Sequence, residues 1–276
     1  MKKMSGKIYF EFGGNYVYIR RQATRKNPKP DGFFYYADRF CADDPDRFAA
    51  EVLAAENFPP LEKNCRVYAA VNLPQTAVRF AEVPPGTDPS EIHGTLFPFG
   101  KFFCGDTHMI SQAALSKKYF CFAALPVAMS NIINSACEKI FGGGSKLVCI
   151  DTIEHQISRR YAGKNGNFFV LQRYCGCKPL DGSKPQNGGY RAVSFHNGVP
   201  VETYRIDGFN LGLELDRLFA SLTAEQIPDE AIIIKEPDFF SFDEKNYGLL
   251  QKKLCDAGIG VSEDENARNY FSGSLF

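Results

Sequence analysis

The chain has 276 residues, of which 44% are hydrophobic and 23% are charged, and lysine plus arginine equals aspartate plus glutamate at 32 each. This length allows one large domain or two ordinary ones, and the composition argues against wholesale disorder. The zero net charge argues against a protein that binds nucleic acid mainly through its phosphates, so we expect no nucleic-acid partner.

The first half of the chain predicts strands that begin as hairpins and then alternate with helices. Helices are expected after Asp44 and Asp88, because Asp caps free backbone N–H groups, and from Pro126, because Pro suits the start of a helix. The sequence from Asp151 to Glu154 predicts a further helix with Asp151 as its cap, although the two acids could also be read as paired carboxylates. The expected strands of this half are 8–12, 16–21, 33–37, 66–71, 78–83, 109–115, 119–125 and 146–150.

The second half repeats the same programme of antiparallel strands followed by helix–strand alternation. The turn-forming residues 163–167 predict a domain boundary, which gives a first domain at 1–164, with an inserted small subdomain, and a shortened second domain at 165–276. The expected strands of the second domain are 168–171, 190–195, 199–206, 231–234 and 259–261, with helices marked by Leu211 to Leu222 and by Tyr247 to Leu254.

The cysteines and histidines predict no metal site. Nine cysteines are scattered along the chain, and several lie within apolar strand patterns, as small buried hydrophobic residues do in a reducing compartment. Cys175-Gly176-Cys177 is the one close pair, and its role is left open between a structural one and a metal or redox one. The four histidines have no metal-ligand spacing.

Targeting and membrane segments are not expected either. The apolar run at Ile8-Tyr9-Phe10 is broken by Glu11 and is too short for a signal peptide. No stretch approaches the roughly 20 apolar residues of a membrane-spanning helix. We therefore expect a soluble protein that does not insert into a membrane directly.

The order of these segments resembles the type IV pilus assembly protein PilM and the cytoplasmic part of the secretion protein GspL, members of the actin-like superfamily. The likeness covers nearly the whole chain and rests on the opening 8–14 with 17–19, the stretch 83–99, the segments 120–125 and 147–151, the segment 205–209 and the end 231–261. It implies an α/β, two-lobed actin-like (ribonuclease H-like) fold with mixed five-stranded sheets flanked by helices.

The resemblance also implies a nucleotide site between the lobes, and the residues depart from it. Actin-like ATPases use an Asp near the metal and glycine N–H groups that meet phosphate oxygens. Here Glu11, Gly13 and Gly14 form what looks like a vestigial phosphate loop, and Leu171 stands where a second acid is expected. In the third loop Pro237 supplies no N–H, so we expect a pseudo-ATPase with no catalytic residues and no cofactor.

The function implied by the resemblance is a cytoplasmic assembly adaptor that works through protein–protein interaction. In PilM-like systems such a protein binds the tail of an inner-membrane, PilN-like partner, which would place this chain peripherally at the inner membrane. The implied partner groove includes Phe97, Pro98 and Phe99, although these residues could equally be ordinary core. Self-association is a further expectation.

Two alternatives come from other classes of protein. One is an active actin-like ATPase or sugar-kinase-like phosphotransferase that uses Glu11 at the metal. The other is an interaction protein with an unrelated α/β fold.

Overall fold

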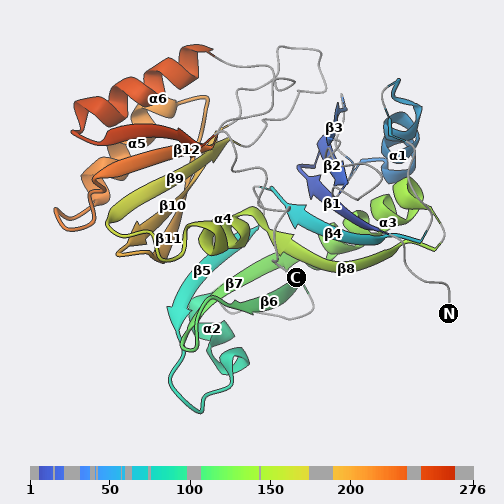
Figure 1. Ribbon diagram of the computed structural model, residues 1–276, viewed down its shortest axis with the longest axis horizontal. Helices are drawn as coiled ribbons and strands as arrows, with labels where there is room; N and C mark the ends of the chain where they lie inside the picture. Colours follow the sequence, from blue (N-terminus) through green and yellow to red (C-terminus); the bar gives the residue numbers. More distant parts are fainter. Residues whose placement is uncertain are drawn as a thin grey trace.

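The structure is a computed structural model, shown in Figure 1. It describes residues 6–14, 16–21, 32–37, 41, 43–56, 58–59, 64–73, 76–97, 107–142, 144–173, 189–234 and 244–264. No helix in these ranges is long and apolar enough to cross a bilayer.

The first lobe is built on a five-stranded mixed sheet with the order β3-β2-β1-β4-β8. β1 pairs antiparallel with β2 and parallel with β4, so the opening hairpin leads directly into the parallel half of the sheet. The strands are β1 (Lys7–Phe12), β2 (Tyr16–Arg21), β3 (Gly32–Tyr36), β4 (Arg66–Val71) and β8 (Lys146–Thr152).

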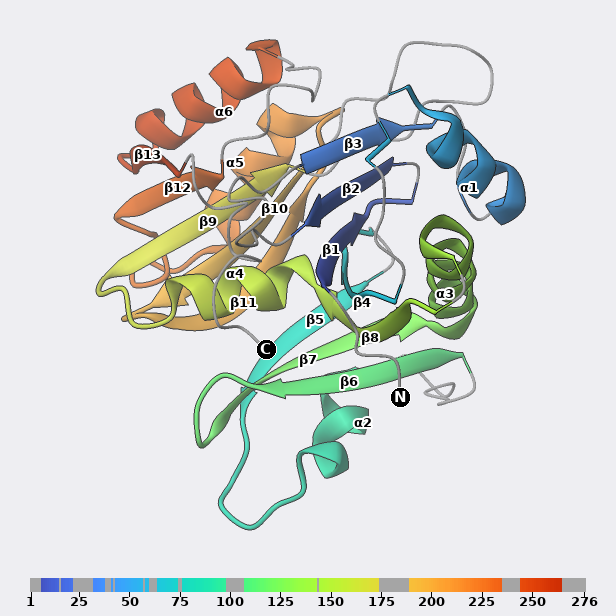
Figure 2. The same ribbon diagram turned by 45° about the vertical axis from the view of Figure 1, so that its right-hand side comes forward.

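Helices α1 (Pro45–Ala54) and α3 (Val127–Phe141) cover one face of this sheet (Figure 2). As predicted, Asp44 caps α1, and its carboxylate accepts a hydrogen bond from the Arg47 backbone N–H at 3.0 Å. The apolar faces of both helices pack on the sheet in one core, in which Phe10, Phe48 and Ile133 are fully buried.

A second, smaller sheet is inserted between β4 and β8. It has the order β5-β7-β6, from β5 (Ala77–Glu82), β6 (His108–Ala114) and β7 (Tyr119–Pro126). The helix expected after Asp88 forms as a 3-10 turn, η1 (Pro89–Ile92), followed by the short α2 (His93–Leu96). These elements cover a face of the small sheet around the buried Phe122.

The second lobe repeats the topology of the first sheet. Its order is β11-β10-β9-β12-β13, and β9 pairs antiparallel with β10 and parallel with β12. Helices α5 (Leu211–Ser221) and α6 (Glu244–Asp256) pack on one face, and α5 leads to β12 with no inserted subdomain. The strands are β9 (Asn167–Arg173), β10 (Tyr190–His196), β11 (Val199–Ile206), β12 (Glu230–Ile234) and β13 (Gly260–Asp264). The predicted fold class, two mixed five-stranded sheets flanked by helices, is confirmed.

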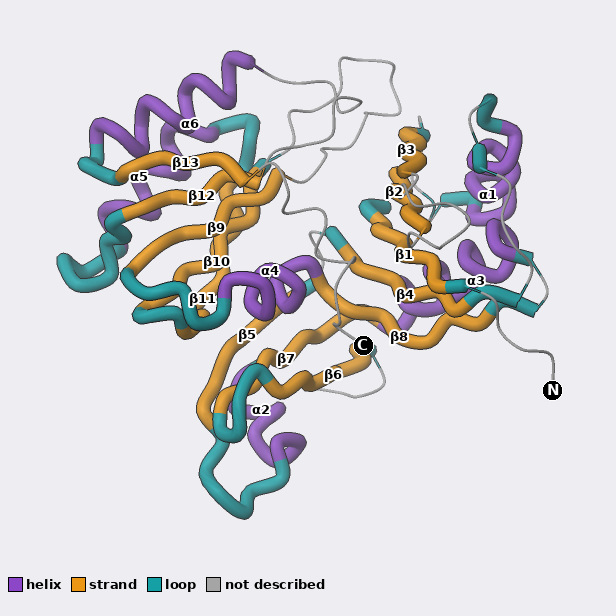
Figure 3. The backbone as a smooth tube through the Cα atoms, viewed as in Figure 1, coloured by secondary structure: helices purple, strands orange, loops and turns teal. Residues whose placement is uncertain are grey.

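Helix α4 (Ile153–Tyr161) lies between the two lobes (Figure 3). Its Ile153 and Ile157 belong to a core that takes Tyr68 from the first sheet and Phe168 from the second. The lobes are therefore joined by a shared apolar core as well as by the chain. The exact domain boundary stays a prediction.

The predicted cap of α4 is wrong by one residue. β8 continues through Thr152, and the Thr152 hydroxyl, not the Asp151 carboxylate, accepts from the His155 backbone N–H at 3.2 Å. Asp151 instead accepts from the Thr152 backbone N–H at 2.8 Å and from His155 Nδ1 at 2.6 Å. The acid that follows three residues later, Glu154, is buried and faces the second lobe.

Candidate functional site

The opening hairpin places Glu11 on the face of the first sheet that looks toward the second lobe. Glu11 lies next to Ala70 of β4, and its side chain is only 1% exposed. The Tyr16 hydroxyl donates to Glu11 Oε1 at 2.7 Å, and the Asn72 side-chain amide donates to the same hydroxyl at 2.9 Å. Glu11 is thus held by a tyrosine of its own hairpin.

Backbone groups of both glycines of this hairpin form hydrogen bonds with other backbone groups of the protein. The Gly13 N–H donates to the Tyr16 carbonyl at 3.0 Å, and the Gly14 carbonyl accepts from the Cys41 N–H at 2.8 Å. The Tyr16 ring packs so closely on Gly13 that a Cβ there would collide with it. Gly14 has a φ of 86°, which a turn of this kind requires. The hairpin thus does not present the bare Gly13 N–H that a phosphate oxygen would need.

The second lobe contributes an arginine to the same region. Arg191 of β10 is 4% exposed and lies on the strand face shared with Val193, which packs in the interlobe core. Its guanidinium donates to the Glu154 carboxylate at the start of α4 and to the carbonyl of Leu73, just after β4. One side chain of the second lobe therefore contacts two segments of the first lobe, the start of α4 and the residues just after β4.

We call Glu11, Tyr16, Asn72, Glu154 and Arg191 the interlobe polar cluster. Burial lowers the pKa of the Arg191 guanidinium to about 10, with a smaller contribution from Arg205, so the group remains charged at neutral pH. A buried charge is tolerated only where a partner compensates for its lost hydration, and Glu154 and the Leu73 carbonyl supply that compensation. One oxygen of Glu154 and the amide oxygen of Asn72 are among the buried side-chain atoms that have no hydrogen-bond partner within the described residues.

Two of the charged groups in this cluster are engaged within the protein. Glu11 Oε1 accepts from Tyr16, and the buried guanidinium of Arg191 is paired with Glu154. No group of three or more His, Cys, Asp or Glu side chains within the described ranges could hold a metal ion. The geometry of the interlobe polar cluster can hold the two lobes together.

The structure places Leu171, the residue expected at the position of a second acid, on the outer face of the second sheet. Leu171 is buried in the outer core of the second lobe, between the sheet and its helices, and points away from the first lobe. Its neighbour Gln172 is also buried and is in register with Arg191 on the adjacent strand. Pro237, Cys175 and Cys177 lie outside the described residues.

The predicted partner groove is only partly described. Phe97 is 2% exposed and packs against Val83, Phe122 and Ala124 of the small sheet, so this residue is core. Pro98 and Phe99 lie outside the described residues, and the groove that the three were expected to form stays a prediction.

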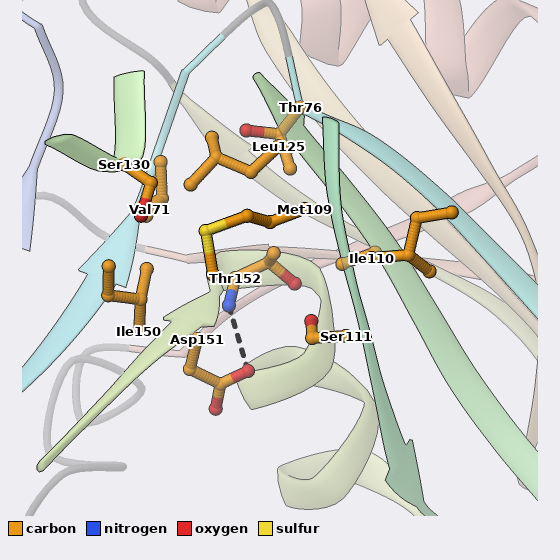
Figure 4. A pocket seen from close by; sticks show the side chains of 11 residues that line it. Val71, Thr76, Met109, Ile110, Ser111, Leu125, Ser130, Ile150, Asp151 and Thr152 are labelled. Atoms are coloured by element: carbon orange, nitrogen blue, oxygen red, sulfur yellow. Dashed lines mark hydrogen bonds between the residues drawn. The ribbon is translucent and has the colours of Figure 1, made fainter. Parts of the chain in front are cut away.

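A cavity of about 60 Å³ lies within the first lobe, between the small sheet and the five-stranded sheet (Figure 4). The Met109 side chain lies across it, between Leu125 and Ile150. Its walls are mostly apolar, and Asp151 adds a carboxylate. The residues that line it are Val71, Thr76, Met109, Ile110, Ser111, Ala123, Leu125, Ser130, Ile150, Asp151 and Thr152. We call this cavity the first-lobe pocket.

The sequence singled out Glu11 and the two glycines as candidate site residues, but it gave no indication that Tyr16 and Arg191 belong to the same region. Tyr16 was interpreted only as the start of a strand, and Arg191 as one residue of a hairpin. Arg191 and Leu73 are 118 positions apart, so no local pattern links them. The one available signal was an arginine in a strand that is otherwise almost wholly buried, which requires a partner.

The sequence matches no protein-family model and no curated protein. Several solved structures are similar over nearly the whole chain, and two of them have a TM-score above 0.5. A Bacteroides thetaiotaomicron protein with actin-like ATPase fold and unknown function has 9% identity and a TM-score of 0.57, over 98% of this chain and 96% of that one. The PilM–PilN type IV pilus biogenesis complex has 12% identity and a TM-score of 0.63, over 98% and 91%.

A third match is weaker. The cytoplasmic domain of EpsL, an inner-membrane component of the type II secretion system of Vibrio cholerae, has 8% identity and a TM-score of 0.48, over 99% of this chain and all of that one. We draw no argument from it. The repeated strand order and the two stronger matches together establish that this chain has the actin-like ATPase fold, and at this level the resemblance predicted from the sequence is confirmed.

Proposed function

We propose that this protein is a non-catalytic assembly adaptor of a type IV pilus or type II secretion-like system. It works on the cytoplasmic side of the inner membrane, where it binds the cytoplasmic tail of a membrane protein. The observation that carries the proposal is the interlobe polar cluster, in which Tyr16 donates to Glu11 and Arg191 is paired with Glu154. The likeness to the PilM–PilN structure supports the assembly role, because that fold occurs there in a protein complex.

The first-lobe pocket is the best-supported place for the partner's tail. It lies beside β6, one of the two edge strands of the small sheet, and an extended peptide can add to such an edge through main-chain hydrogen bonds. The apolar walls fit one apolar side chain of that peptide. Met109 is 53% exposed, and it both belongs to the edge strand β6 and lines the pocket.

Calorimetric titration of the full chain with Mg-ATP tests the non-catalytic part. We expect no binding at micromolar concentration. Micromolar binding would overturn this part and favour the alternative, an actin-like ATPase or sugar-kinase-like phosphotransferase with Glu11 at the metal. In that case the wild type must show turnover, and Glu11→Gln must abolish it.

The partner is tested with a synthetic peptide of the cytoplasmic tail of a single-span membrane protein encoded beside this chain. We expect binding, and an at least about tenfold loss of affinity in Met109→Asp, because the charge would enter an apolar pocket. Val148→Asp is the matched control, since Val148 is also an exposed apolar strand residue but does not line the pocket. Equal loss in both variants, or no binding to the wild type, would count against this site.

A further inference from the structure

The first-lobe pocket and the interlobe polar cluster share a wall made of two short segments. On the first segment, Val71 and Thr76 line the pocket, and Leu73 between them offers its carbonyl to Arg191. Asn72, also between them, donates to Tyr16. The same few residues at the end of β4 thus face the pocket on one side and the second lobe on the other.

The second segment is the start of α4, and it has the same two-sided character. Asp151 and Thr152 line the pocket, while Glu154, on the first turn of the helix, pairs with Arg191. The turn is internally braced, because the Asp151 carboxylate accepts from His155 Nδ1 at 2.6 Å and from the Gln156 side-chain amide. A displacement of Glu154 would therefore move the Asp151 side of the pocket as well.

We propose that Arg191 is an interlobe latch that sets the shape of the first-lobe pocket, so that pocket occupancy and lobe arrangement are coupled. Arg191 contacts both segments of the shared wall, one through a carboxylate and the other through a backbone carbonyl. Neutralising either partner of the pair leaves a buried charge uncompensated, and the wall must move to let water or another group reach it. The coupling is reciprocal, so a group that fills the pocket should also change the contacts that Arg191 makes with Glu154 and Leu73.

The coupling does not depend on the adaptor proposal, because it concerns two sites within the chain. Its first test is methyl NMR on the full chain, labelled at its four methionines. Met109 reports on the pocket, and Met129 reports on the core of the first lobe. We expect Glu154→Gln and Arg191→Gln to shift the Met109 methyl resonance by more than they shift that of Met129.

The matched control for this test is Arg217→Gln. Arg217 also pairs with a glutamate, Glu214, at 2.9 Å, but that pair is exposed on α5 in the second lobe. The control should leave the Met109 resonance in place. A Met109 resonance that is unchanged in folded Glu154→Gln protein would overturn the proposal.

The reverse test fills the pocket and does not touch the latch, so it decides the question even where a latch variant fails to fold. Ser111 is exposed on β6 and lines the pocket, and Ser111→Leu places an apolar side chain there. We expect amide hydrogen exchange in α4 to change by about fivefold or more, the lower end of typical allosteric coupling, while exchange in α6 stays constant. Unchanged exchange in α4, or an equal change in α4 and α6, would contradict the coupling.

Discussion

At the residue scale, packing explains why a glycine is needed at position 13 of the opening hairpin. The resemblance implies a vestigial phosphate loop here, and in the structure Gly13 makes room for the ring of Tyr16. Tyr16 is fully buried, so its ring cannot swing out to accept a larger neighbour. The glycine is therefore required by packing, whether or not a ligand has ever bound there.

Replacing Gly13 with alanine tests this packing. We expect Gly13→Ala to lower the free energy of unfolding by about 1–3 kcal/mol, because the added methyl group overpacks the Tyr16 ring. Urea denaturation measures the change. Gly248→Ala is the control: Gly248 lies within α6 with open space around its Cα, so alanine there should stabilise by about 0.5–1 kcal/mol. Equal stability of Gly13→Ala and wild type would contradict the packing explanation.

Single residues were predictable from the sequence where their role is local. Asp44 was correctly predicted as a cap, because the capping residue and the N–H groups it serves are neighbours in the chain. The cap of α4 was misplaced, because Asp151 and Thr152 are both good capping residues and only the tertiary contacts of Asp151 decide between them. The Arg191 latch was not predictable, because its partners come from distant parts of the chain.

At the scale of elements, the strands and the apolar helices were predicted from the sequence. Helix α4 was predicted as a helix, but the burial of its polar residues was not. Most of the strands were recognised from their apolar runs and their turns. The polar Glu154, His155, Gln156 and Ser158 of α4 suggest a solvent-facing side, and all four are buried. These side chains find partners within the protein. Glu154 pairs with Arg191 of the second lobe, whereas His155 and Gln156 bond to Asp151, and Ser158 donates to the Glu154 carbonyl.

The burial of α4 gives a prediction at this scale. Ile157 is fully buried in the interlobe core, so Ile157→Ala should lower the free energy of unfolding by about 2–5 kcal/mol through lost burial and a residual cavity. Chemical denaturation gives the value. The control is Ile227→Ala, because Ile227 is 41% exposed and its truncation should cost well under half as much. Similar costs for the two isoleucines would show that α4 is not packed between the lobes.

At the scale of the whole molecule, the two sheets share one topology and one core. The order and direction of the five strands are the same in both, which the repeated pattern of the sequence predicted. The shared core could not be predicted, because the residues that form it, such as Tyr68 and Phe168, look like ordinary sheet residues of separate domains. Aromatic packing across it includes the Phe168–Phe195 stack, with ring centroids 4.6 Å apart.

The shared core predicts that the lobes unfold together. Separation would expose the interlobe faces of both sheets and α4, so neither lobe is expected to persist alone. We expect a single transition in urea, coincident by far-UV circular dichroism and by the fluorescence of the 13 tyrosines, which no tryptophan obscures. Two separated transitions would mean that the interlobe core contributes little to stability.

The burial of α4 on every side also has a consequence for synthesis. A ribosome completes β8 and α4 well before it reaches β12 and β13, which come last among the described strands. For that interval the nascent first lobe carries Ile153, Ile157 and Tyr161 with no second sheet to cover them. The nascent chain thus exposes this apolar surface until the second sheet has been made, and this is the period in which a chaperone would have most to protect.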